Sequence, residues 1–294
     1  MGGRTRIAVI GSTGQLGSDL VNALANSQRN DVLPLSHEHV EVCRQESVRN
    51  ALVRARPQII VNCAAFVRVD DCEDQVDTAF QINSLGALHV ARACAEIDAL
   101  CVYISTDYVF DGTKGTAYVE NDLPCPINVY GASKLAGEYL VRQAAPRWLI
   151  ARVASLFGKS GARGKGGNFI EAILEKATKN ESLHIVNDVW MSPTHTRDAA
   201  DALAELLQVE YEGVIHLTNA GACTWYEFGK AALELVGLNV SIDPVRSTTY
   251  RTRARRPANS ALASKTAQTI LSRMLPTWEE ALQNYLIEKR YLAA

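Results

Sequence analysis

Tyr130 and Lys134 are the residues of this chain whose types and spacing best suit proton transfer. On a helix, positions four apart share one face, so the phenol and the ammonium group would point into the same space. A phenol with a pKa of about 10 is a poor acid at neutral pH, and a nearby cation lowers that pKa by stabilising the phenolate. The pair therefore favours acid-base chemistry, although the same spacing also occurs on solvated helix faces.

A hydroxyl group is expected beside this pair. The stretch CVYIST is typical of a buried strand that ends at Ser105 and Thr106, and ligands of open α/β sheets bind at the carboxyl ends of strands. Thr106 could donate a hydrogen bond to a substrate carbonyl oxygen, or it could satisfy the turn after the strand. Its combination with Tyr130 and Lys134 is more specific than any one of the three.

A glycine-rich turn, GSTGQLG, follows the apolar run RIAVI and precedes a helical pattern. Glycine lets the backbone approach a pyrophosphate, whose charge is favoured by the free N–H groups at a helix N-terminus. The turn therefore predicts a dinucleotide site. The residues expected to contact the cofactor here are Gly11, Ser12, Thr13, Gly14, Gln15, Leu16 and Gly17.

The second strand indicates which dinucleotide is bound. Many such folds end this strand with a carboxylate that binds the ribose 2′-hydroxyl of NAD, whereas here it ends at Ser36 and His37. This favours NADPH and leaves NADH open. Glu41 could touch the adenine edge or be solvated. After the third strand, three small residues would form a smooth wall for the nicotinamide half: Cys63, Ala64 and Ala65.

The elements that must position these residues alternate between strands and helices. Five short apolar runs are predicted strands: Arg6–Ile10, Val32–Leu35, Ile59–Asn62, Leu100–Ser105 and Trp148–Val153. Between them a helical period covers Gln15–Asn26, Gln45–Arg56, Thr78–Ile97 and Val129–Ala144. Further helices are predicted at Phe169–Lys179, Thr196–Gln208, Trp225–Leu235 and Trp278–Lys289, with extended segments at Leu183–Val186 and Val214–Leu217. Such alternation predicts an α/β fold with a doubly wound parallel sheet of Rossmann type.

The regular alternation ends after Val153, which suggests a second, smaller α/β substrate-binding lobe. We expect residues 1–155 to form the NAD(P)-binding domain, completed by about 188–218, and residues 156–187 and 219–294 to form the lobe. The glycine-rich stretch 158–168, with Lys159, Arg163 and Lys165, is typical of a loop beside a ligand.

Composition excludes several classes of protein. The 294 residues include 47% apolar and 21% charged residues, which excludes disorder. Thirty basic against 32 acidic residues leave a net charge of −2, which predicts no nucleic-acid partner. The seven cysteines lack a C-x-x-C pair, so reduced thiols are expected, with no metal cluster. No apolar run approaches the roughly 18 residues that a spanning helix needs, which predicts a cytoplasmic protein without membrane contact.

Taken together, these motifs resemble the extended short-chain dehydrogenase/reductase family. Matching blocks extend over most of the chain: GSTGQLG, RPQIIVNCAAFVRVDDCE, STDYVFDGT, PINVYGASKLAGE, NDVWMSPT and RPANSAL. Within that family they are similar to reductases that act on the C4 ketone of a nucleotide-linked 4-dehydro-6-deoxyhexose. The resemblance implies that dTDP-4-dehydrorhamnose is reduced to dTDP-L-rhamnose. Tyr108 after Asp107, in place of an acidic residue, fits reduction without dehydration.

The resemblance also implies residue roles. Tyr130 would donate the proton, Lys134 would hold the nicotinamide ribose, and Thr106 would bind the reacting oxygen. The nucleotide sugar would contact Thr106, Asp107, Tyr130, Asn168, Arg256 and Asn259. Arg256 belongs to a basic stretch at 246–257, whose guanidinium groups suit phosphate oxygens.

Departures from the family pattern leave alternatives open. Ser155 stands where the family commonly has Trp near the substrate, and Asp19 stands where it often has Glu, which leaves a Mg²⁺ role undecided. A homodimer is also left open. One alternative is a non-catalytic NADP-binding regulatory subunit similar to the β subunit of methionine adenosyltransferase. Another is a different sugar-nucleotide ketoreductase or an epimerase.

Overall fold

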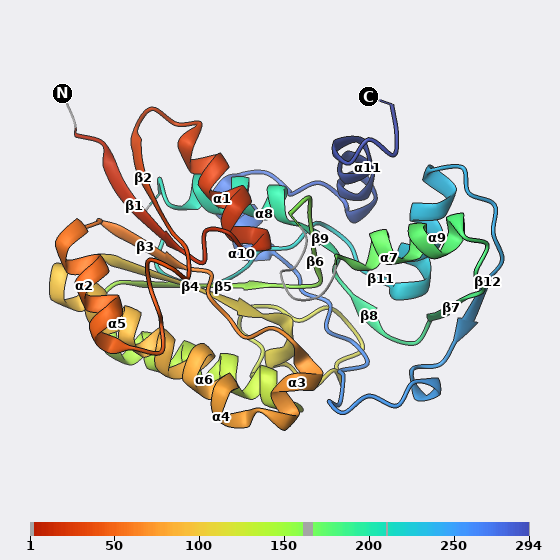
Figure 1. The fold of residues 1–294 in the computed structure, drawn as a ribbon, viewed down its shortest axis with the longest axis horizontal. Coiled ribbons are helices and arrows are strands. Elements are labelled where there is room, and N and C mark those ends of the chain that lie inside the picture. The colour runs from red at the N-terminus through yellow and green to blue at the C-terminus, as the bar shows by residue number, and fades with distance from the viewer. Residues whose placement is uncertain (1–2, 161–166, 210, 294) are drawn as a thin grey trace.

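The computed structural model describes residues 3–160, 167–209 and 211–293. Its centre is a six-stranded sheet with the order β10-β5-β4-β3-β1-β2, and every neighbouring pair is parallel (Figure 1). The strands are β1 (Thr5–Ile10), β2 (Asn30–Leu35), β3 (Ile59–Asn62), β4 (Leu100–Thr106), β5 (Trp148–Val153) and β10 (Gly213–His216). The strand order reverses between β1 and β3, which is where open α/β sheets bind ligands.

Helices bury both faces of this sheet (Figure 1). On one face Ile7 and Val9 of β1 pack with apolar residues of α1 (Gln15–Ala25) and α8 (Thr196–Leu206). On the other face Ala8 and Ile10 belong to a core shared with α2 (Gln45–Ala55), α5 (Gly86–Ile97) and α6 (Val129–Ala144). Burial on both faces explains why the strands are continuously apolar.

A third apolar core lies beyond the carboxyl ends of the strands. It joins α7 (Phe169–Thr178), α9 (Trp225–Leu235) and α11 (Trp278–Glu288), and includes Phe157 and Phe228. Short strand pairs surround it, namely β12 (Ile242–Val245) with β7 (Leu183–Val186), β11 (Cys223–Thr224) with β8 (Trp190–Met191), and β6 (Leu156–Phe157) with β9 (Thr194–His195). These elements form the right-hand part of Figure 1.

The predicted Rossmann-type fold is confirmed, and the predicted bounds of β3, β5, β7, α6 and α9 agree with the structure. The expected helix at Thr78–Ile97 lies within an unbroken helical run, which consists of α4 (Val76–Phe80), a π-helical turn η1 (Gln81–Leu85) and α5. Buried Asn83 lies in the π-helical turn. Its side chain bonds both backbone groups of Phe66, and its carbonyl accepts the Tyr103 hydroxyl at 2.7 Å.

Several short elements were not predicted from the sequence. They include α3 (Val69–Asp74), the 3-10 turns η2 (Asp107–Val109) and η3 (Ser247–Thr249), and α10 (Lys265–Leu271), which packs beside α8 and β10. Among the helices that the structure describes, none has the length and apolar character needed to cross a bilayer. The division into two domains stays a prediction.

Candidate active site

The glycine turn lies between the carboxyl ends of β1 and β3. Gly11 has a φ of +74°, and a Cβ there would lie 3.0 Å from the backbone nitrogen of Ala64, so both conformation and space require glycine. Gly14 begins α1 as its N-cap and provides no side-chain cap. The first N–H groups of α1 are therefore available to an anion, as a pyrophosphate site requires.

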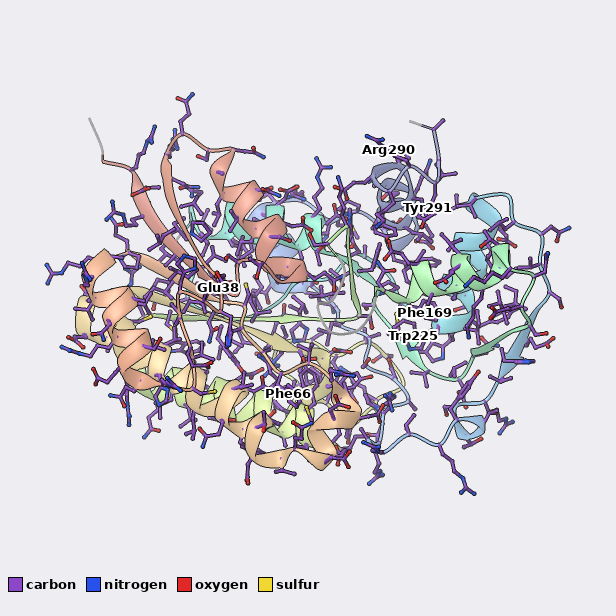
Figure 2. The ribbon with its side chains drawn as sticks, viewed as in Figure 1. Glu38, Phe66, Phe169, Trp225, Arg290 and Tyr291 are labelled. Atoms are coloured by element: carbon purple, nitrogen blue, oxygen red, sulfur yellow. The ribbon has the colours of Figure 1, made fainter. Side chains whose placement is uncertain are left out.

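A pocket of about 650 Å³ extends from this turn to α7 and α9. Of the residues predicted to bind cofactor or substrate, those lining it are Gly14, Gln15, Leu16, Gly17, Cys63, Ala65, Thr106, Asp107, Tyr130, Lys134 and Asn168. The far wall is aromatic: Phe169 of α7 and Trp225 of α9 lie next to each other, with ring centroids 4.7 Å apart (Figure 2). The pocket thus joins a dinucleotide turn to a hydroxyl, a phenol and an amine.

Tyr130 lies in the first turn of α6, which begins where Asn128 caps the helix by accepting the Gly131 N–H at 2.8 Å. Burial raises the pKa of Tyr130, although an interaction with the Thr106 side chain opposes the shift. This is the opposite of the lowered pKa predicted from the sequence, because desolvation outweighs any neighbouring cation. The phenol therefore has the proton that a donor needs, but burial alone makes it a weaker acid than a free phenol.

Thr106 satisfies its own turn and also lines the pocket. Its hydroxyl accepts the Tyr108 N–H at 3.2 Å and donates to Asp107 Oδ1 at 3.0 Å. Burial raises the pKa of the Asp107 carboxyl to about 6, against hydrogen bonds from Ser260 and Thr106 that lower it. In this geometry Thr106 satisfies its own turn, and donation to a substrate oxygen requires the hydroxyl proton to turn away from Asp107.

Lys134 lies one helical turn beyond Tyr130 and is almost fully buried. Its Nζ donates to the carbonyl oxygen of Ile104 at 2.6 Å and lies 4.0 Å from the centroid of the Tyr103 ring. Burial lowers the pKa of Lys134 to about 7, while Glu138 and Cys63 oppose the shift. The Lys134 amine is therefore only partly protonated at neutral pH.

Some predicted cofactor residues lie beside this pocket and do not line it. The glycine turn contains Gly11, Ser12 and Thr13, of which Gly11 and Ser12 donate their N–H groups to the Leu35 carbonyl. Ala64 follows β3. Ser36 pairs with His39, its Oγ 2.7 Å from Nδ1. Glu41 accepts the Cys43 N–H at 3.2 Å and lies 3.3 Å from His37. Ser36 and Glu41 thus make local contacts beyond the end of β2.

The predicted substrate residues are more dispersed. Asn168 caps α7, accepting the Glu171 N–H at 3.1 Å, and donates to the Tyr285 hydroxyl at 2.8 Å. Asn259 donates to the carbonyl oxygens of Lys114 and Thr116, so its amide holds a loop. Arg256 forms an ion pair with Asp70 of α3 at 2.6 Å. Arg163 and Lys165 lie outside the described residues, and Lys159 is exposed.

A second pocket of about 880 Å³ adjoins the first, because Phe169, Ala172 and Trp225 line both. Its basic lining consists of Lys176, His184, Arg251, Arg255 and Arg256. Sequence reasoning placed only Arg256 in a binding role and missed the aromatic wall. The helical period of α7 and α9 predicted these helices but not which of their side chains would line the pockets.

No group of three or more His, Cys, Asp or Glu side chains among the described residues is arranged to hold a metal ion. Burial raises the pKa of the Cys63 thiol to about 12, so it stays protonated and serves as a small wall residue. Ser155, which stands where the family commonly has Trp, lines the first pocket with a φ of +41°.

The parallel sheet, the glycine turn at its switch point and the Tyr130/Lys134 pair define a Rossmann-type protein of the extended short-chain dehydrogenase/reductase class. The sequence profile of the RmlD substrate binding domain matches residues 5–291. The chain therefore belongs to the RmlD substrate binding domain family.

Individual relatives agree with this assignment. The chain is 37% identical over 285 residues to the spore coat polysaccharide biosynthesis protein SpsK of Bacillus subtilis, covering 97% of this chain and 98% of the relative. It is 35% identical to the dTDP-4-dehydrorhamnose reductase of Burkholderia thailandensis, covering 94% and 96%. The crystal structure of dTDP-4-dehydrorhamnose reductase from Bacillus anthracis in complex with NADP superposes with a TM-score of 0.91 at 33% identity, covering 97% and 99%.

Proposed function

We propose that this protein is an NADPH-dependent reductase of the C4 ketone of a nucleotide-linked 4-dehydro-6-deoxyhexose, with dTDP-4-dehydrorhamnose as substrate and dTDP-L-rhamnose as product. The observation that carries the proposal is the single pocket in which the N-terminus of α1 meets Thr106, Tyr130 and Lys134. The names of the relatives from Burkholderia thailandensis and Bacillus anthracis support the substrate.

The cofactor fits the turn on structural grounds. Gly17 leaves no space for a side chain, because its Cβ would lie 2.2 Å from the Gly11 carbonyl oxygen, and the uncapped start of α1 leaves N–H groups for a pyrophosphate. The second strand ends at Leu35 and is followed by Ser36, without a carboxylate there to repel a 2′-phosphate, which supports NADPH over NADH.

The chemistry needs a hydride and a proton. Bound NADPH supplies the hydride. Tyr130, protonated at neutral pH, donates its phenolic proton to the oxygen that becomes the C4 hydroxyl. The Thr106 hydroxyl, once turned from Asp107, donates a hydrogen bond to that oxygen. The Lys134 ammonium binds the ribose hydroxyls of the cofactor beside Tyr130.

The nucleotide of the substrate belongs in the second pocket. Phe169 and Trp225 join the two pockets, so a sugar near Tyr130 continues into a diphosphate near the basic lining. Asp70 holds Arg256 in an ion pair. The remaining N–H groups of the Arg256 guanidinium would contact a diphosphate while this ion pair is kept. Asn168 lines the sugar end of the first pocket, and Asn259 acts through the loop that it holds.

We further propose a cytoplasmic protein in which residues 1–155 with about 188–218 bind the cofactor and the remainder binds the nucleotide sugar. The third apolar core, which contains α7, α9 and α11, supports this division. The division is not followed by α10, because Ala267 packs in a sheet core.

The test is incubation with NADPH and a panel of 4-keto-6-deoxy sugar nucleotides, following the loss of NADPH absorbance and the stereochemistry of the product at C4. Turnover of dTDP-4-dehydrorhamnose to dTDP-L-rhamnose is the expected result. Tight NADPH binding with no turnover of any panel member would contradict the proposal and favour a regulatory subunit.

A further inference from the structure

We propose that Glu138 and Arg152, a buried ion pair behind the reaction centre, are positioning residues that hold α6 in register with β4 and balance the charge around Lys134. This inference rests on the proposed function, because it assigns both residues to the Tyr130/Lys134 machinery. Glu138 lies four residues after Lys134 and eight after Tyr130, so all three share one face of α6.

The ion pair is buried, and the guanidinium and carboxylate groups face each other in a bidentate arrangement. The side chains of Arg152 and Glu138 are 4% and 3% exposed, and the guanidinium makes two parallel contacts, Nε to Oε1 at 2.9 Å and Nη2 to Oε2 at 2.7 Å. Charges are seldom buried without a specific reason, since well-packed apolar residues are often as stabilising at such a position. The location of the pair indicates what that reason is.

Consecutive residues of β4 connect this pair to the pocket. The Ile104 carbonyl accepts Lys134 Nζ at 2.6 Å, and the Ser105 hydroxyl donates to Glu138 Oε1 at 2.5 Å. The next residue is Thr106, which lines the pocket with Tyr130. A shift of α6 along β4 would therefore break two contacts and separate Tyr130 from Thr106.

The pair also determines the charge near Lys134. Lys134 is faced by Glu138 on its own helix, by the protonated Cys63 after β3 and by the Tyr103 ring of β4. Arg152 of β5 lies behind Glu138, and in strand register it is beside Ser105 of β4 and His216 of β10. Burial and Arg152 lower the pKa of His216 to about 3, so His216 is neutral at pH 7.

Removal of one partner leaves the charge of the other unbalanced near Lys134. In Glu138→Gln the remaining Arg152 cation disfavours the ammonium, so the pKa of Lys134 falls. In Arg152→Met the remaining Glu138 anion favours it, so the pKa rises. A purely structural pair would give two similarly weakened proteins with no such opposition.

The experiment measures NADPH affinity by fluorescence titration from pH 5.5 to 10 in the whole protein, together with kcat/KM where substrate is turned over. Affinity is expected to fall as pH rises through the pKa of Lys134. We expect Glu138→Gln to move this fall down by about one pH unit, and Arg152→Met to move it up by about as much. A shift of the profile in the same direction for both variants would overturn the proposal, and so would the absence of a shift in both.

Three further variants separate charge from packing. Glu212→Gln, in the exposed Arg147–Glu212 pair, is the matched control and should leave the profile in place. Ser105→Ala removes the contact to Glu138 without changing charge, so kcat should fall while the profile stays. If a single variant does not fold, the double variant Glu138→Gln/Arg152→Met takes its place, because it leaves no unpaired charge. Its pH profile should lie within a few tenths of a pH unit of the wild-type profile. A larger displacement would refute the inference.

Failure of the proposed function has a different signature. A wild-type protein that binds NADPH but reduces no sugar nucleotide would refute the reductase, whereas the opposed shifts in NADPH affinity would still support the ion pair.

Discussion

Gly17 packs so closely on Gly11 that a Cβ at position 17 would lie 2.2 Å from the Gly11 carbonyl oxygen. This contact brings the start of α1 against the end of β1, and it determines where the free N–H groups of the helix point.

Gly17→Ala is expected to destabilise the protein by roughly 1–3 kcal/mol, because a methyl group cannot enter without moving the turn. NADPH affinity should fall with it. Urea unfolding and fluorescence titration measure the two effects. Gly115→Ala is the control, since a Cβ there meets nothing within 4 Å, and an equal loss in both variants would contradict the argument.

Tyr130→Phe removes the phenolic proton and leaves the ring. NADPH binding should be retained, while kcat falls by a factor of about 10²–10⁴, which is typical for loss of a positioned proton donor. Steady-state kinetics and a binding titration on the same preparation measure both quantities. Turnover near the wild-type rate would exclude Tyr130 as the acid.

Lys134→Ala should weaken cofactor binding as well as turnover, because the ammonium is proposed to bind the ribose. In the wild type the pKa of Lys134 is about 7, so the ammonium fraction and NADPH affinity should both fall as pH rises through 7. In the variant this part of the pH dependence should disappear. An unchanged affinity in Lys134→Ala would count against the assignment.

Asp107 should reduce stability at neutral pH. Its pKa is raised from 3.8 to about 6, so between these values the folded state binds more protons than the unfolded state, and the free energy of unfolding falls as pH rises. Asp107→Asn mimics the protonated carboxyl and should gain stability relative to wild type, by about 2 kcal/mol more at pH 7.5 than at pH 4.5. Urea unfolding at both pH values tests this. The exposed Asp77→Asn should show no such pH-dependent gain.

The sequence determined the elements and most of the reaction centre, because both depend on local patterns. Continuous apolar runs predicted β3 and β5 with the observed bounds, and the glycine spacing predicted the turn before α1. The spacing of Tyr130 and Lys134 placed them on one helix face, since helical geometry relates residues four apart. Glu138 continues the same spacing, and this signal in the sequence was overlooked.

Only the tertiary structure decided which distant segments meet. Asn83, in the π-helical turn, bonds Phe66 and Tyr103, and Arg256 is held by Asp70 of an unpredicted helix. The direction of the Tyr130 pKa shift likewise depends on burial, which is a property of the packed pocket and not of local spacing. Contacts between residues far apart in the chain depend on how helices pack on the sheet, and a local pattern contains no information about that packing.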